Sequence, residues 1–175
     1  AAIFRRKHNW VMCLLYLGTF GSFIGYAAGF PLLIKSQFPG INPLAYAWLG
    51  PLVGAVVRPF GGWLADKLGG ARVTLWNFVV MAVAVVGVIQ FLPHAGEGGN
   101  FAGFFVCFLV LFLTTGIGNG STFRMIPVIF LTEAMQGVDK FDTAAVAAAT
   151  KEGNTLGAAT LGFTAAIAAY GGFFI

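Results

Sequence analysis

Residues 45–64 read AYAWLGPLVGAVVRPFGGWL, a run of mostly apolar residues in which Arg58 is the one charged side chain. A helix needs about 20 such residues to cross a bilayer, so the run predicts a membrane-spanning helix. A guanidinium keeps its charge at neutral pH, and a charge at that depth is costly. Arg58 therefore indicates a ligand or ion path, and because the run contains no carboxylate we expect its partner to be an anionic substrate.

The composition of the whole chain also indicates a membrane protein. Hydrophobic residues make up 58% of the 175 residues and charged residues only 9%, whereas soluble domains average about 25% charged residues. The net charge of +4 comes from basic residues at the ends of apolar runs, so it predicts topology and not nucleic-acid binding. Cys13 and Cys107 lie within apolar runs, and we expect both to be buried free thiols.

The apolar runs predict an all-α fold, a polytopic bundle of transmembrane helices. The predicted spans are 10–34, 45–64, 73–92, 101–131 and 153–175. The charged stretch 132–152, with its Ala-rich middle, is interpreted as an interfacial or short helical loop. The odd number of spans, and an end without a polar flank, suggest a fragment of a longer protein.

Lysine and arginine positions predict the orientation. With alternating spans, seven basic residues fall on one side and only Lys35 on the other. Positive residues favour the cytoplasm, so the N-terminal end and the loops 66–72 and 132–152 are predicted to be cytoplasmic in a multi-pass protein of the inner (plasma) membrane. The seven residues are Arg5, Arg6, Lys7, Lys67, Arg72, Lys140 and Lys151.

The loop after the second predicted span reads GWLADKLGGAR over residues 62–72. Asp66 can cap a neighbouring helix or pair with a cation, and the glycines permit a tight turn between helices. The loop resembles the G-x-x-x-D-[RK]-x-G-G-x-[RK] motif of the major facilitator superfamily, with an ordinary charged turn as the alternative. The matching residues are Gly62, Asp66, Lys67, Gly69, Gly70 and Arg72.

Four further segments resemble a narrower group, the nitrate/nitrite porters of the NarK type. They are LLYLGTFGSFIG at 14–25, GPLVGAVVRPFGG at 50–62, GIGNGSTF at 116–123, and 162–174, which begins GF and ends GGFF. The resemblance implies helices seven to eleven of twelve, without the N-terminal half or the last helix. Ala165 and Ala168 depart from the pattern, which has Ser and Gly there.

The resemblance implies transport of nitrate and/or nitrite by alternating access. Arg58 would then be one of two arginines that hold the anion, the other lying in the absent N-terminal half. Tyr16 would hydrogen-bond the substrate and Phe20 would form a wall of the pocket. These two share a helix face at i and i+4, and the planar fork of arginine suits a flat oxyanion. An aromatic-belt position for Tyr16 and simple packing for Phe20 are the alternatives.

Five more residues are candidates for the pathway or for gating: Asn119, Arg124, Gly162, Gly171 and Gly172. For Arg124, snorkelling to the headgroups is the favoured interpretation. The glycines permit close helix packing, which can be static or a rocking surface. No pattern of a catalytic or metal site is visible, so we predict no enzyme, no cofactor and no metal. The predicted partners are the anion, the lipid bilayer and the absent half. Alternatives are a transporter of another small or organic anion, and a membrane sensor with the same fold.

Overall fold

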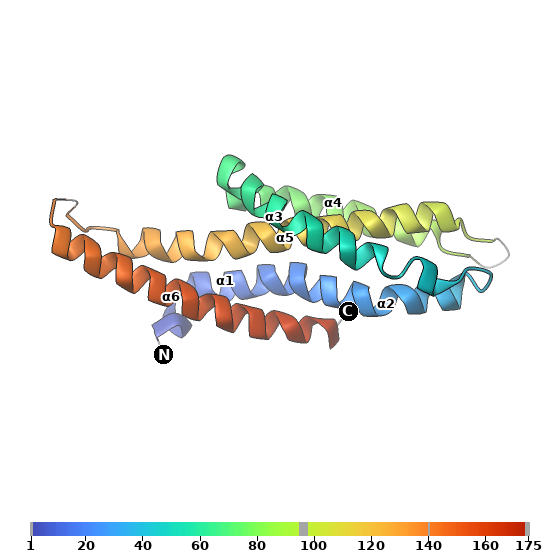
Figure 1. Ribbon diagram of the computed structural model, residues 1–175, viewed down its shortest axis with the longest axis horizontal. Coiled ribbons are helices and arrows are strands. Elements are labelled where there is room, and N and C mark those ends of the chain that lie inside the picture. Colours follow the sequence, from blue (N-terminus) through green and yellow to red (C-terminus); the bar gives the residue numbers. More distant parts are fainter. Residues whose placement is uncertain (1, 95–97, 140, 174–175) are drawn as a thin grey trace.

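The computed structural model describes residues 2–94, 98–139 and 141–173, and within these ranges it is a bundle of long helices without a β-strand (Figure 1). The all-α prediction is confirmed. Lys140 and the end of the last predicted span lie outside the described residues. The elements are η1 (Ala2–Arg5), α1 (Lys7–Tyr16), η2 (Leu17–Gly21), α2 (Ser22–Gln37), η3 (Pro43–Ala45), α3 (Leu49–Leu68), α4 (Gly70–Phe91), α5 (Phe101–Ala134), α6 (Thr143–Ala169) and η4 (Tyr170–Phe173).

The first span is one continuous helical rod built from α1, η2 and α2, and η2 is a turn of π-helix. Two hydroxyls bond back to the backbone around this turn: the Thr19 hydroxyl donates to the Leu15 carbonyl and the Ser22 hydroxyl to the Gly18 carbonyl. Single π turns inside α-helices are rare and are frequent at functional sites. The turn includes Phe20, one of the predicted site residues.

Four helical segments in the described ranges are long and apolar enough to cross a membrane: Lys7–Gln37, Gly70–Phe91, Phe101–Ala134 and Thr143–Phe173. This supports a multi-pass membrane protein. Helix α3 is long enough to cross a membrane but is less apolar than these four, since it holds several glycines together with Arg58, Asp66 and Lys67. The second predicted span, 45–64, begins too early, because Ala45 ends η3 and helix α3 begins only at Leu49.

The stretch 132–152, predicted as an interfacial or short helical loop, consists largely of the ends of two long helices with a short connection between them. Helix α5 continues to Ala134, and α6 begins at Thr143, well before the predicted start of the fifth span. Asp142 is the N-cap of α6, and its side chain accepts hydrogen bonds from the Ala144 and Ala145 amides. Alanine has the highest helix propensity, so the Ala-rich segment continues as helix once it is capped.

Helix α5 lies in the middle of the bundle, with α3, α4 and α6 around it (Figure 1). The contact with α3 is close because glycines face backbone across it. An added Cβ at Gly116 would collide with the backbone of Gly54, and one at Gly120 would collide with the carbonyl of Arg58. Small residues let membrane helices approach in this way. The Arg58 backbone is therefore held directly against α5.

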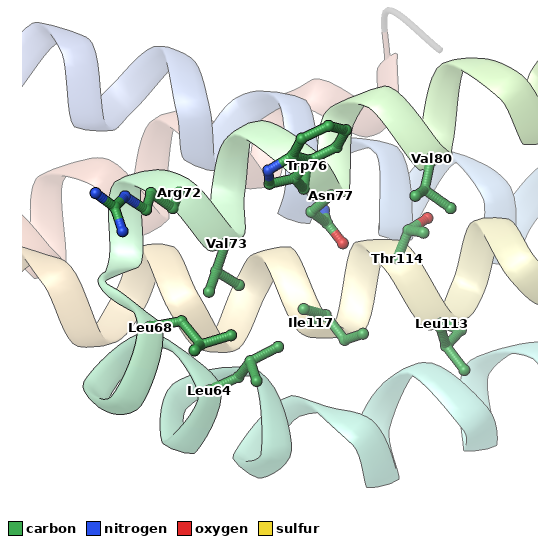
Figure 2. Close-up of a pocket in the computed structure, with 10 residues that line it drawn as sticks. All are labelled: Leu64, Leu68, Arg72, Val73, Trp76, Asn77, Val80, Leu113, Thr114 and Ile117. Carbon is green, nitrogen blue, oxygen red and sulfur yellow. The ribbon is translucent and has the colours of Figure 1, made fainter.

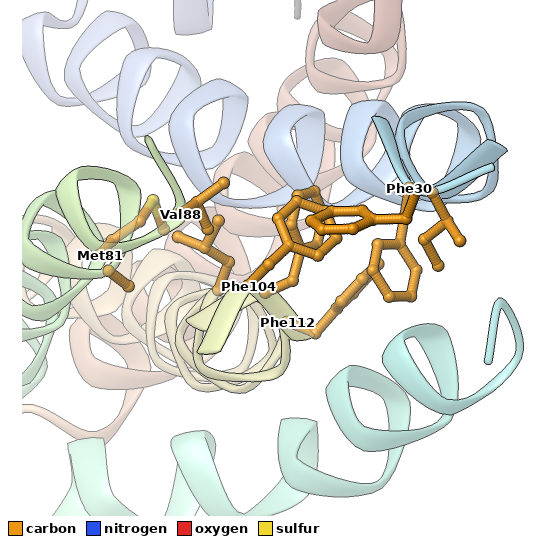
Figure 3. Close-up of a cluster of buried hydrophobic side chains, with 10 residues drawn as sticks. Phe30, Met81, Val88, Phe104 and Phe112 are labelled. Atoms are coloured by element: carbon orange, nitrogen blue, oxygen red, sulfur yellow. The ribbon is translucent and has the colours of Figure 1, made fainter. Parts of the chain in front are cut away.

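An aromatic cluster fills the end of the bundle where α2 ends and α5 begins (Figure 3). Phe30 on α2 is fully buried and stacks on Phe108 of α5 with ring centroids 4.6 Å apart. Phe104 and Phe112 of α5 flank it, and Met81 of α4 joins the same cluster. Stacked and edge-to-face aromatic pairs contribute about 0.5–1.5 kcal/mol each beyond their area burial. The cluster fixes α2 and α4 on α5.

Ion pairs tie three segments together at the opposite end. Arg6 Nη1 donates to Glu133 Oε2 at 2.9 Å, and His8 Nδ1 bonds the other oxygen of the same carboxylate. Arg6 Nη2 also lies 3.6 Å from Glu152 of α6. The N-terminal segment, the end of α5 and the first turns of α6 thus meet at one end of the bundle.

Candidate anion site

The structure brings together Arg58, Tyr16 and Phe20, the three residues that the sequence analysis assigned to the substrate. Arg58 Nη2 donates a hydrogen bond to the Tyr16 hydroxyl at 2.5 Å. The Arg58 guanidinium carbon lies 5.4 Å from the centre of the Phe20 ring, within reach of a cation–π interaction. The Tyr16 and Phe20 rings are stacked, 5.2 Å apart and 9° from parallel. One cation is therefore flanked by two parallel rings and one hydroxyl.

Local backbone structure positions each of these side chains. Tyr16 is the last residue of α1 and Phe20 lies in the π turn that follows. On α3, Arg58 is followed by Pro59, which has no N–H and so leaves the Ala55 carbonyl without its usual helical partner. The Arg58 carbonyl packs against Gly120, where no Cβ fits. The arginine is thus set on a helix whose path is fixed by α5.

Arg58 also lines a mostly apolar hollow of about 360 Å³, whose lining includes neither Tyr16 nor Phe20. Its volume falls in the range of ordinary small-ligand pockets. Phe123 of α5 lines it, with its ring 6.3 Å from that of Tyr16 and 45% exposed. Sequence reasoning missed Phe123 as a site residue, although it ends the segment GIGNGSTF. The other lining residues are Ala55, Arg58, Pro59, Gly62, Gly120 and Arg124.

The charge of Arg58 is not neutralised by any carboxylate in the described part of the chain. The ion pairs found there are those of Arg6 and His8 with Glu133, of Arg6 with Glu152, and of Arg124 with Asp66. A guanidinium has five N–H donors, and the bond to Tyr16 uses one of them. The remaining donors can bind an anion.

Arg124, the second arginine of the hollow, has an acidic partner in the loop motif. Its Nε donates to both carboxylate oxygens of Asp66, at 2.9 and 3.1 Å. Of the two roles that the sequence left open for Asp66, pairing with a cation is the one found. The motif glycines act in the turn: Gly69 has a φ of +88°, which favours glycine, and Gly70 lies against Met125 too closely for a side chain. The side chains of Arg124 and Asp66 are each about half exposed.

Within the described residues, Lys67 and Asn119 form no hydrogen bond or ion pair with Arg58, Tyr16 or Phe20. The Lys67 ammonium lies over the Trp63 ring, 4.5 Å from its centre. Asn119 is 2% exposed, and its Oδ1 has no hydrogen-bond partner among the described residues. It does not line the hollow, so its role in a pathway stays a prediction.

The three predicted glycines of the last helix differ in their surroundings. Gly171 packs on the backbone of Gly21 in the π turn, and Gly172 packs on Ile24. Gly162 is exposed and has open space where a side chain would be. The first two therefore set the distance between the last helix and the first span. A pathway or gating role stays a prediction for all three.

The long apolar helices define a class of protein, a multi-pass membrane protein, and its relatives place it in the major facilitator superfamily. The nitrate/nitrite transporter NarU of Escherichia coli (strain K12) is 50% identical over 173 residues, which is 99% of this chain and 37% of the relative. The probable nitrate/nitrite antiporter NarK2 of Thermus thermophilus is 38% identical over 98% of this chain and 34% of the relative. The nitrite extrusion protein of Bacillus subtilis (strain 168) is 30% identical over 76% of this chain. No protein-family model matches the chain.

The chain belongs to the NarK-type family of nitrate/nitrite porters, as its sequence predicted. It spans little more than a third of the length of the curated relatives it matches, consistent with the C-terminal half of such a porter. The relatives are named as transporters and not as enzymes.

Proposed function

We propose that this chain forms half of a transporter that moves nitrate or nitrite by alternating access, and that Arg58 holds the anion. The observation that carries the proposal is the Arg58 guanidinium, which bonds the Tyr16 phenol, lies over the Phe20 ring and has no carboxylate partner in the described residues. The names of the relatives, which include nitrate/nitrite transporters and a nitrite extrusion protein, support the choice of anion.

The geometry suggests how the anion is held. Arg58 donates to the Tyr16 oxygen, so the hydroxyl hydrogen of Tyr16 is directed elsewhere and is available to the anion. The free N–H groups of the guanidinium can bind two oxygens of a planar ion at once. The Phe20 ring, parallel to that of Tyr16, would cover one side of the ion. Such a site selects for small flat anions by shape as well as by charge.

The proposal includes a second half with its own arginine, so that the anion is bound between the halves near the midplane of the membrane. It also includes an orientation with the N-terminal end of this chain in the cytoplasm and the protein in the inner membrane. The basis is the seven-to-one distribution of basic residues. The predicted spans of this chain carry no embedded carboxylate of the kind that proton relays use. We therefore favour anion exchange, and one relative is named as a probable antiporter.

The test is uptake of labelled nitrate by the complete protein in proteoliposomes, with or without nitrite inside. Exchange predicts that internal nitrite accelerates uptake. We expect Arg58→Lys to abolish uptake, because an ammonium cannot present the bidentate fork. Arg5→Lys, an exposed arginine outside the hollow, is the matched control and should transport at the unmodified rate. Uptake at that rate with Lys at position 58 would refute the role of Arg58.

A further inference from the structure

A second hollow, an apolar trough of about 430 Å³, lies between α3, α4 and α5. It shares no lining residue with the anion site. Figure 2 shows Leu64 and Leu68 reaching from α3 toward Val73 on α4, with Ile117 of α5 between them. Because most of its lining is hydrocarbon, the trough suits an apolar chain better than a water-soluble ligand.

One end of the trough is positively charged. Arg72 lines it at the turn between α3 and α4, and its guanidinium projects past Val73 at that end (Figure 2). Lys67, in the last turn of α3, does not line the trough, and its ammonium lies over the Trp63 ring. Arg72 takes part in no ion pair within the described ranges, and Asp66, the acid nearest in sequence, is bound to Arg124. Arg72 therefore presents a cation at this end of the trough, with a charge complementary to an anionic headgroup.

The depth of the trough fits the dimensions of a membrane leaflet. Arg72 and Val80 both line it and lie on one helix, so at 1.5 Å per residue it extends about 12 Å from the charged end. The hydrocarbon core of a bilayer is about 30 Å thick, so the trough leads toward its middle. Beside it, the outer face of α4 is apolar, with Trp76 and Val83 each 67% exposed. Such a face is suited to contact with lipid.

We propose that the trough binds an acyl chain of an anionic phospholipid, whose phosphate lies against Arg72. Lysine and arginine near a membrane surface attract anionic headgroups, and each contributes a gain of about fivefold in binding. The apolar lining holds the chain and Arg72 selects the headgroup. Free phosphate could contact only the charged end of the trough. A zwitterionic lipid could place its acyl chain in the trough, but it lacks the net negative charge that Arg72 attracts.

The test is native mass spectrometry of the complete protein, titrated with phosphatidylglycerol or with phosphatidylcholine. We expect tighter binding of phosphatidylglycerol, and Arg72→Gln should weaken it about fivefold while phosphatidylcholine changes little. Leu113→Trp, at a partly exposed position in the trough, should weaken both lipids because the indole occupies the space of the chain. Lys7→Gln removes an exposed cation outside the trough and should change neither.

Four results would overturn the proposal. The first is equal binding of the two lipids, and the second is equal weakening by Arg72→Gln and Lys7→Gln, which would indicate general surface charge. The third comes from a variant whose remaining tryptophan is Trp76, reconstituted with phosphatidylglycerol that carries a quencher on its acyl chain. Unquenched Trp76 fluorescence would show that another part of the complete protein covers the trough. Binding of inorganic phosphate that competes fully with the lipid would likewise assign the site to the free ion.

Discussion

Removal of one oxygen atom, by Tyr16→Phe, tests the geometry of the anion site most directly. The ring of Tyr16 is 2% exposed and stacked on Phe20, so phenylalanine keeps the packing. What is lost is the hydroxyl that accepts from Arg58 Nη2 and that, in the proposed site, donates to the anion. The change therefore separates hydrogen bonding from the shape of the pocket.

The expected magnitude follows from the charge of the partner. A hydrogen bond to a charged group contributes about 1.5–3 kcal/mol, so losing the bond to the anion should weaken nitrate affinity by roughly ten- to a hundredfold. Loss of the Tyr16 oxygen also frees the Arg58 N–H that it accepted from, and this N–H can turn to the anion and recover part of the affinity. We therefore expect an effect at the lower end of this range, with the fold intact.

The assay is a binding titration of nitrate with the purified complete protein, combined with its thermal unfolding. Tyr26→Phe is the matched control, since it removes the same atom from the same span, where the ring packs on Phe108 and away from Arg58. It should leave nitrate affinity unchanged. An unchanged affinity in Tyr16→Phe, with both variants folded, would show that this hydroxyl does not face the anion and would refute the placement of the site.

Three further changes test other parts of the structure. Phe20→Ala should open space beside the Arg58 guanidinium and relax selection against larger anions, so competition by chlorate-sized and larger oxyanions should rise while nitrate still binds. Glu133→Gln should lower the free energy of unfolding by about 1–3 kcal/mol, because this carboxylate, 19% exposed, accepts from Arg6 and His8 of the N-terminal segment. An unchanged melting temperature would show that these bonds do not stabilise the fold. After removal of Cys13 and Cys107, a cysteine introduced by Leu68→Cys should resist impermeant reagents from outside, and rapid labelling there would reverse the orientation.

Much of the fold was readable from the sequence because the signal is local. The length of an apolar run predicts a membrane helix without reference to the rest of the chain. Arg58 stood out for the same reason, since a charge inside such a run is unusual wherever the run packs. The loop motif at 62–72 and the segments similar to nitrate/nitrite porters identified the family. Local signals gave only part of the answer at 132–152, predicted as an interfacial or short helical loop, because capping by Asp142 and alanine propensity begin a long helix at Thr143.

The tertiary structure alone decided which side chains meet. Arg58 and Tyr16 are far apart in sequence, and their bond depends on how α3 and the first span rotate against α5. The same packing paired Arg124 with Asp66, added Phe123 to the hollow, and left Arg72 beside an apolar trough. Sequence periodicity gives the face of a helix but not the neighbour that the face contacts. That neighbour is set by close approach, here by glycines that let α3 and α5 touch backbone to backbone.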